Sequence, residues 1–129
     1  MKFDFEKINI LHVFDVDPCT APRQVYSDRW KKRTSVMKYR AAKDELRLTS
    51  KNYMIPPVVN VLFVIPFPKS YSKKKRNELL HSGHQIKPDR DNLLKWFQDT
   101  LCDEDRYIWG GETYKIWGEK GQVIIYERK

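Results

Sequence analysis

The pattern of apolar and polar residues predicts two strands in the first half of the chain. Residues 8–16 alternate loosely and are rich in Ile, Val and Phe, and Pro18 follows the run. Residues 58–65, Val-Val-Asn-Val-Leu-Phe-Val-Ile, are apolar almost throughout and end at Pro66. A strand buried on both faces lacks alternation. The second run is therefore expected at the centre of a sheet.

Two further segments carry apolar residues at helical spacing. The first is residues 34–49, where the spaced positions are Val36, Tyr39, Ala42 and Leu46. The second is expected to begin near Asp89, because Pro88 precedes it and apolar residues then recur three or four positions apart. Its apolar positions are Leu93, Trp96, Phe97 and Leu101. The basic segment 69–80 predicts one more short helix, and a polar loop is expected at residues 81–87.

The C-terminal quarter predicts two more strands. Residues 107–117 have strand-like composition, with a bulge expected at Gly110 and Gly111. A turn at residues 119–121 leads into a last strand at residues 122–126. The whole pattern predicts an α/β (α+β) fold, with a small mixed sheet of about four strands and two or three helices. The length fits one domain, residues 1–129.

Charge then narrows the class of partner. The chain has 25 Lys and Arg against 17 Asp and Glu, which gives a net charge of +8 and a pI of about 9.5. Such a balance favours a polyanion, and nucleic acid is the leading candidate. No segment resembles a membrane anchor or an amphipathic membrane-surface helix. Acidic residues at the N-terminus interrupt any signal-like apolar run, so a cytoplasmic location, in a bacterial host cell, is expected.

Asp89 and Asp91 stand one residue apart at the predicted start of the second long helix. Residues four apart share a helix face, so Asp91, Lys95 and Asp99 form a polar stripe opposite the apolar one. One interpretation is structural, with Asp89 as a helix cap and ordinary surface ion pairs along the stripe. The other is a site for a hard divalent cation, completed by the acidic residues 103–105 and used in phosphodiester chemistry. Spacing leaves both interpretations open.

Other metal sites fit the sequence less well. The acids at 89–91 begin like a calcium loop, but Leu94 stands where that loop requires glycine. His81 and His84 are three positions apart without the further ligands that zinc needs. Both are expected in a loop, with His84 the better candidate for touching phosphate.

Several motifs together resemble the RusA family of Holliday junction resolvases, in its phage and prophage branch. They are Lys-Pro-Asp-Arg-Asp-Asn-Leu-Leu-Lys at 87–95, Gln-Asp-Thr-Leu at 98–101, Glu-Asp at 104–105, Tyr-Ile-Trp at 107–109 and Lys-Ile-Trp at 115–117. The basic motifs at 22–23, 30–33 and 66–75 add to the likeness. The resemblance covers most of the chain. It implies a homodimeric, magnesium-dependent endodeoxyribonuclease that nicks two strands of a four-way DNA junction symmetrically.

The resemblance also implies roles for individual residues. Asp89 and Asp91 match the paired metal ligands, with one or two Mg²⁺ ions per site, and Lys95 matches the lysine that assists catalysis. Asp105 matches the third catalytic carboxylate and metal ligand. The family more often has Asp-Asp where this chain has Glu104 and Asp105, so Asp103 and Glu104 compete for that role.

Basic residues away from the acids are expected to bind the DNA backbone. The residues assigned to this role are Arg23, Lys31, Arg33, Lys69, Lys73, Lys74, Lys75 and Lys87. Trp30, Tyr71 and Tyr107 are candidates for stacking on unpaired bases or, equally, for packing. Two alternatives remain: a non-catalytic nucleic-acid-binding protein, and a nuclease with the same chemistry that acts on RNA or flaps.

Overall fold

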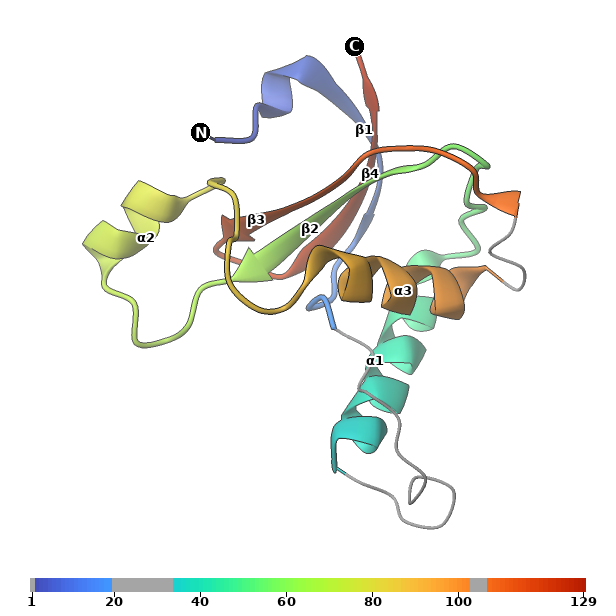
Figure 1. The fold of residues 1–129 in the computed structure, drawn as a ribbon, viewed down its shortest axis with the longest axis horizontal. Helices are drawn as coiled ribbons and strands as arrows, with labels where there is room; N and C mark the ends of the chain where they lie inside the picture. Colours follow the sequence, from blue (N-terminus) through green and yellow to red (C-terminus); the bar gives the residue numbers. More distant parts are fainter. Residues whose placement is uncertain (1, 20–33, 103–106) are drawn as a thin grey trace.

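The computed structural model describes residues 2–19, 34–102 and 107–129. Within these ranges four strands form one mixed sheet in the order β1-β4-β2-β3, which confirms the expected sheet (Figure 1). The central strand β2 pairs in parallel with β3 and antiparallel with β4, and β4 pairs antiparallel with β1. The strands are β1 (Ile8–Phe14), β2 (Asn60–Pro66), β3 (Thr113–Gly118) and β4 (Gln122–Arg128).

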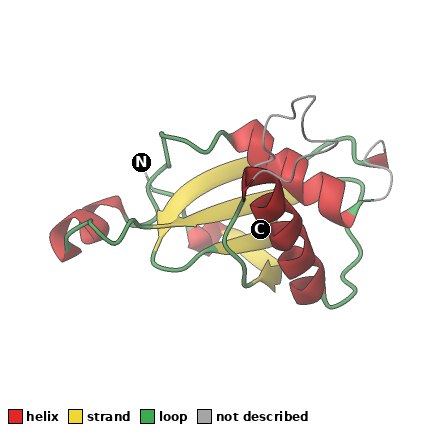
Figure 2. Cartoon of the chain, turned by 90° about the horizontal axis from the view of Figure 1, so that it is seen from below, coloured by secondary structure: helices red, strands yellow, loops and turns green. Residues whose placement is uncertain are grey.

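The helices are arranged mainly on one side of this sheet. The described helices are the short 3-10 helix η1 (Phe5–Lys7) and the α-helices α1 (Thr34–Ser50), α2 (Lys73–Leu79) and α3 (Arg90–Leu101). The helices α1 and α3 contact each other and lie over one face, whereas α2 projects from one end of the molecule (Figure 2). In the described part of the chain, no helix has both the length and the apolar character required to span a bilayer.

The main core lies between the sheet and the helices α1 and α3. On β2, Val61 and Phe63 face this core, together with Leu46 of α1 and Trp96 and Phe97 of α3. All five side chains are fully buried. The buried face predicted for α3 from its apolar spacing is therefore confirmed, because residues three and four apart lie on one side of a helix.

The other face of the sheet carries a second, smaller core. Leu62 and Val64 of β2 point to this side and pack with Ile124 and Tyr126 of β4. Phe3 and Phe5 of the N-terminal segment pack against it. Burial on both faces explains why β2 is apolar from Val61 to Ile65, without the alternation of a half-exposed strand.

One predicted strand starts later than expected. The segment predicted as a strand over residues 107–117 forms β3 only from Thr113 onward, with an isolated bridge between Gly110 and Val58 before it. Gly111 has a φ of +129°, and a Cβ there would overlap the backbone of Val59. Close approach to the backbone of Val59, rather than a strand bulge, is therefore the reason for glycine at this position.

Candidate functional site

The first acidic residue of the predicted pair stands at the start of α3. Asp89 is the N-cap residue, with an extended backbone, and its carbonyl accepts a hydrogen bond from the Leu93 N–H at 3.1 Å. Its carboxylate makes no capping hydrogen bond. An N-cap aspartate ordinarily uses that carboxylate to accept from the first helical N–H groups. The structural interpretation thus explains the position of Asp89 but not its exposed carboxylate, which makes no capping bond.

The second acidic residue is almost completely in solvent. The Asp91 side chain is 94% exposed, and the nearest cationic atom is Arg90 Nε, at 4.0 Å. Lys95 and Asp99 are also exposed, which confirms the predicted polar stripe on α3. The ion pairs expected along the stripe are not observed, because no described carboxylate lies within 4.0 Å of the Lys95 amine.

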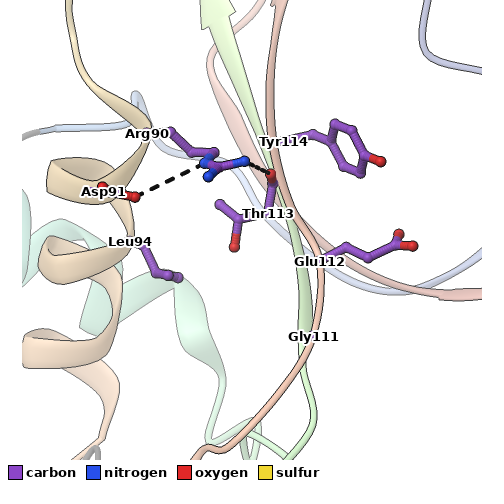
Figure 3. Close-up of a pocket in the computed structure, with 7 residues that line it drawn as sticks. All are labelled: Arg90, Asp91, Leu94, Gly111, Glu112, Thr113 and Tyr114. Carbon is purple, nitrogen blue, oxygen red and sulfur yellow. Dashed lines mark hydrogen bonds and ion pairs between the residues drawn. The ribbon is translucent and has the colours of Figure 1, made fainter.

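Two pockets open at the start of α3. Asp91 lines one of about 300 Å³, which Arg90 and Leu94 of α3 and residues 111–114 also line (Figure 3). Asp89 lines another of about 410 Å³, together with Lys87, Pro88 and Asn92. The structure therefore places the two carboxylates next to each other in the chain but in different pockets.

Contacts with β3 hold the start of α3 and the residues before it in place. Arg90 reaches across the first pocket and donates from Nη1 to the Thr113 carbonyl at 3.4 Å. Lys115 donates from Nζ to the carbonyls of Ile86 and Pro88, at 2.7 and 2.6 Å. Burial lowers the pKa of Lys115, and the charge of Asp89 partly opposes that shift. Sequence reasoning gave Lys115 no role, although a lysine within a predicted strand was a signal.

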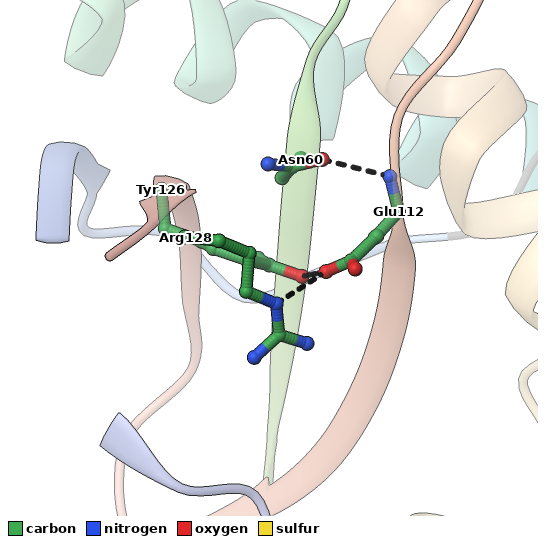
Figure 4. A network of polar contacts seen from close by, with 4 residues as sticks. All are labelled: Asn60, Glu112, Tyr126 and Arg128. Carbon is green, nitrogen blue, oxygen red and sulfur yellow. Dashed lines mark hydrogen bonds and ion pairs between the residues drawn. The ribbon is translucent and has the colours of Figure 1, made fainter. Parts of the chain in front are cut away.

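A polar network stands at the beginning of β3, beside the Asp91 pocket. Glu112 Oε2 accepts from the Tyr126 hydroxyl at 2.8 Å and from Arg128 Nε at 2.9 Å (Figure 4). The Glu112 N–H donates to Asn60 Oδ1 at 2.9 Å. Figure 3 shows the Glu112 carboxylate directed away from Asp91. Glu112, also missed from the sequence, thus joins β2, β3 and β4 beside the pocket and takes no part in an acidic cluster with Asp91.

Several predicted site residues lie outside the described ranges. They are the third carboxylate Asp105, its competitors Asp103 and Glu104, the basic residues Arg23, Lys31 and Arg33, and Trp30. Within the ranges that are described, no three His, Cys, Asp or Glu side chains come together as a metal site.

The predicted DNA-binding lysines in the described ranges are all exposed. Lys73, Lys74 and Lys75 lie on α2, Lys69 precedes that helix, and Lys87 lines the Asp89 pocket. Lys75 places its amine 3.8 Å from the centre of the Tyr71 ring. The helix α2 therefore presents a basic surface at the end of the molecule from which it projects.

The structure describes three of the ring side chains that the sequence made candidates for contacting DNA. His84, expected as the better phosphate contact, is only 3% exposed and packs on Trp117 with ring centres 4.3 Å apart. Burial and the charge of Lys115 lower the pKa of His84, which favours the neutral imidazole. His84 lies in a loop as expected, but its burial argues against contact with phosphate. Tyr71 also packs on Trp117, whereas the exposed Tyr107 donates its hydroxyl to the Ile55 carbonyl at 2.9 Å.

Comparison with known families gives the decisive observation. Residues 15–126, most of the chain, match the family model described as endodeoxyribonuclease RusA. The chain belongs to the RusA family. No curated protein and no solved structure gives a significant match. The resemblance inferred from the motif at 87–95 is thereby confirmed.

Membership in the RusA family fixes the class of activity. The protein is an endodeoxyribonuclease, and the family implies nuclease activity of the Holliday junction resolvase class on branched DNA. RusA resolvases generally depend on divalent metal ions. The interpretation as a non-catalytic nucleic-acid-binding protein is disfavoured by this result.

Proposed function

We propose that this RusA-family protein is a Mg²⁺-dependent endonuclease that resolves four-way DNA junctions by paired symmetric nicks, as a homodimer in the cytoplasm. Asp89, Asp91 and Asp105 hold one or two Mg²⁺ ions, and Lys95 assists the reaction. The observation that carries the proposal is the state of the carboxylates at the start of α3. Asp89 makes no capping bond, and Asp91 is 94% exposed beside a pocket.

The donor chemistry of this segment fits a hard cation. Carboxylate oxygens are ligands that Mg²⁺ prefers, and phosphate oxygens can complete its shell. The Asp89 carboxylate is exposed and makes no capping bond to the helix, so its oxygens can bind an ion. A bound Mg²⁺ would polarise the scissile phosphate and lower the pKa of a water molecule.

The basic residues around the acids suit the substrate. Lys95 lies one helical turn after Asp91 on the same exposed stripe, with no described carboxylate within 4.0 Å. Its amine is therefore available to stabilise the negative charge that develops on the phosphate oxygens. Lys87 and the lysines at 69 and 73–75, with Arg23, Lys31 and Arg33, neutralise backbone phosphates on either side of the cleaved bond.

Paired nicking follows from symmetry. A four-way junction has two equivalent scissile positions, so a two-fold homodimer presents one active site to each. Sedimentation of the purified protein tests the dimer. A plasmid that extrudes a cruciform tests the pairing: paired nicks give linear product directly, whereas independent nicks accumulate nicked circles.

Substitution of Asp91→Asn tests the catalytic assignment. We expect nicking of a four-way junction in Mg²⁺ to fall by about 10²–10³-fold, as when one key electrostatic contact at a transition state is removed. Junction binding in a gel-shift assay should stay the same or tighten, because an anion near phosphate is removed. Asp99→Asn is the matched control, since Asp99 lies two turns further along the same stripe, and it should retain wild-type nicking. Wild-type nicking by Asp91→Asn would contradict the proposal.

A substrate panel separates junction resolution from general nuclease activity. Four-way junctions, three-way junctions, flaps, linear duplexes and RNA are incubated with the wild-type protein and Mg²⁺. Cleavage confined to the four-way junction supports the proposal, and equal cleavage of flaps or RNA would replace it with a broader nuclease.

A further inference from the structure

The loop between α2 and α3 is attached to β3 along its length. Its first part is held by backbone bonds: the His81 N–H donates to the Trp117 carbonyl at 2.9 Å, and the His84 N–H donates to the Lys115 carbonyl at 3.0 Å. Its far end is held where Arg90 donates to the Thr113 carbonyl. Between these points lie residues 86–89, which carry the first proposed metal ligand.

The middle of the loop is held by one side chain. Lys115 stands opposite Phe63 in the parallel β2-β3 pair, on the face covered by the helices. Its half-buried ammonium donates to the carbonyls of Ile86 and Pro88 at 2.7 and 2.6 Å. Two short charge-assisted hydrogen bonds to carbonyls two residues apart fix both the course and the orientation of that backbone.

Asp89 directly follows the second of these carbonyls. Its side chain makes no capping bond, so the backbone before it sets where the Asp89 Cα lies and which positions the carboxylate can reach. Resting on the function proposed above, we infer that Lys115 is a positioning residue: its amine fixes the 86–88 backbone and so aims the Asp89 carboxylate at the metal ion.

A competing effect gives the inference a definite sign. An ammonium group near a dication repels it, so a lysine with no positioning role would weaken metal binding, and its removal would tighten binding. Residues that orient metal ligands have the opposite effect, and their loss typically weakens affinity by about 10–100-fold. The two short bonds to the loop favour the positioning effect.

The test measures Mn²⁺ binding to the full-length protein without DNA, from the paramagnetic resonance signal of free Mn²⁺. In Lys115→Met, which keeps the length of the side chain and removes its donors, we expect the affinity to fall by about tenfold. In Lys115→Arg, which keeps the charge and the donors, we expect affinity within about threefold of wild type. Lys120→Met, in the turn after β3, is the control and should bind Mn²⁺ as wild type does.

A double-mutant cycle shows whether the effect passes through Asp89. In the Asp89→Asn background, adding Lys115→Met should change Mn²⁺ affinity by less than about twofold. An equal loss in both backgrounds, or unchanged or tighter binding by Lys115→Met alone, would overturn the inference. If Lys115→Met does not fold, as judged by circular dichroism, Lys115→Gln takes its place, since its shorter amide cannot bridge both carbonyls.

These outcomes are separable from failure of the proposed function. If the wild-type protein neither binds Mn²⁺ nor nicks a junction, the metal-dependent nuclease proposal itself fails. If the wild type does both and Lys115→Met binds Mn²⁺ normally, only the role of Lys115 is overturned. A rise in the Mn²⁺ concentration for half-maximal nicking, with a nearly unchanged maximal rate, is the kinetic counterpart of the expected result.

Discussion

The acidic residues near the start of α3 differ in whether other side chains of the fold hydrogen-bond to their carboxylates. Glu112 is held by Tyr126 and Arg128 within hydrogen-bonding distance, and its carboxylate is thereby committed to the fold. Asp89 and Asp91, by contrast, carry exposed carboxylates: that of Asp89 makes no capping bond, and that of Asp91 has a long ion pair, 4.0 Å, with the exposed Arg90. Because an exposed carboxylate is free to bind an ion whereas an engaged one is not, function is assigned to the second group.

The engaged group gives a prediction about pH and stability. Burial raises the pKa of Tyr126, and its hydrogen bond to Glu112 raises that pKa further. Its folded pKa therefore exceeds the unfolded value of about 10. The resulting stability is fully present below pH ~10 and is lost as the pH rises toward the folded pKa.

Substitution of Tyr126→Phe should destabilise the protein at pH 7 by about 1–3 kcal/mol, because it removes a buried donor to a carboxylate. The gap between the two proteins should narrow above pH ~10, where the wild type alone loses the contribution of Tyr126. Urea unfolding at both pH values measures this. Tyr71→Phe is the control, because the contacts of Tyr71 with Phe67 and Trp117 are made by its ring, which phenylalanine keeps. A gap that stays constant with pH would contradict the assignment.

At the scale of elements, the segment before β3 shapes the Asp91 pocket. Gly111 lines that pocket and lies against the backbone of Val59, next to β2. The sequence predicted a strand over residues 107–117 with a bulge at Gly110 and Gly111, because Tyr, Ile and Trp favour strands. Strand propensity contains no information on how closely two backbone segments approach. The start of β3 was therefore predicted too early.

Gly111→Ala should therefore destabilise the protein by at least ~2 kcal/mol, through a φ of +129° and overlap with Val59. Gly83→Ala is the matched control, since a Cβ at Gly83 meets nothing within 4 Å, and it should change stability by less than ~0.5 kcal/mol. Thermal unfolding compares the two. Equal melting temperatures for both variants would show that the backbones can separate at little cost.

At the scale of the whole molecule, basic and acidic side chains lie in different places, although the protein is basic overall. The net charge is +8, and exposed lysines on α2 project from one end, away from the acids at the start of α3. Long-range attraction to DNA therefore comes from many residues, whereas metal binding depends on few.

Junction affinity should consequently fall steeply with salt, and the slope reports the number of phosphate contacts. Lys73→Gln with Lys74→Gln should reduce the slope of log affinity against log salt by about 2, without altering the preference for junctions. Lys51→Gln with Lys129→Gln removes the same charge from exposed positions outside α2 and should reduce the slope by less than about 1. Equal slopes for the two double variants would remove α2 from the DNA-binding surface. Fluorescence anisotropy with a labelled junction supplies the measurement.

The sequence by itself determined the local features of this protein. Apolar spacing predicted α3 and its buried face, the largely apolar run at 58–65 predicted the central strand β2, and the motif at 87–95 predicted the RusA family. These features depend on residues within a few positions of one another, so periodicity and motif spacing capture them.

Only the tertiary structure decided which distant residues meet. Lys115 contacts the Pro88 carbonyl across 27 positions, and Glu112 reaches Asn60 across 52, because β3 pairs in parallel with β2 after a long connection. The fold also buries His84, which the sequence predicted only as a loop residue and a candidate for touching phosphate. Strand pairing and burial depend on the free energy of packing the whole core. A short stretch of sequence does not determine that free energy.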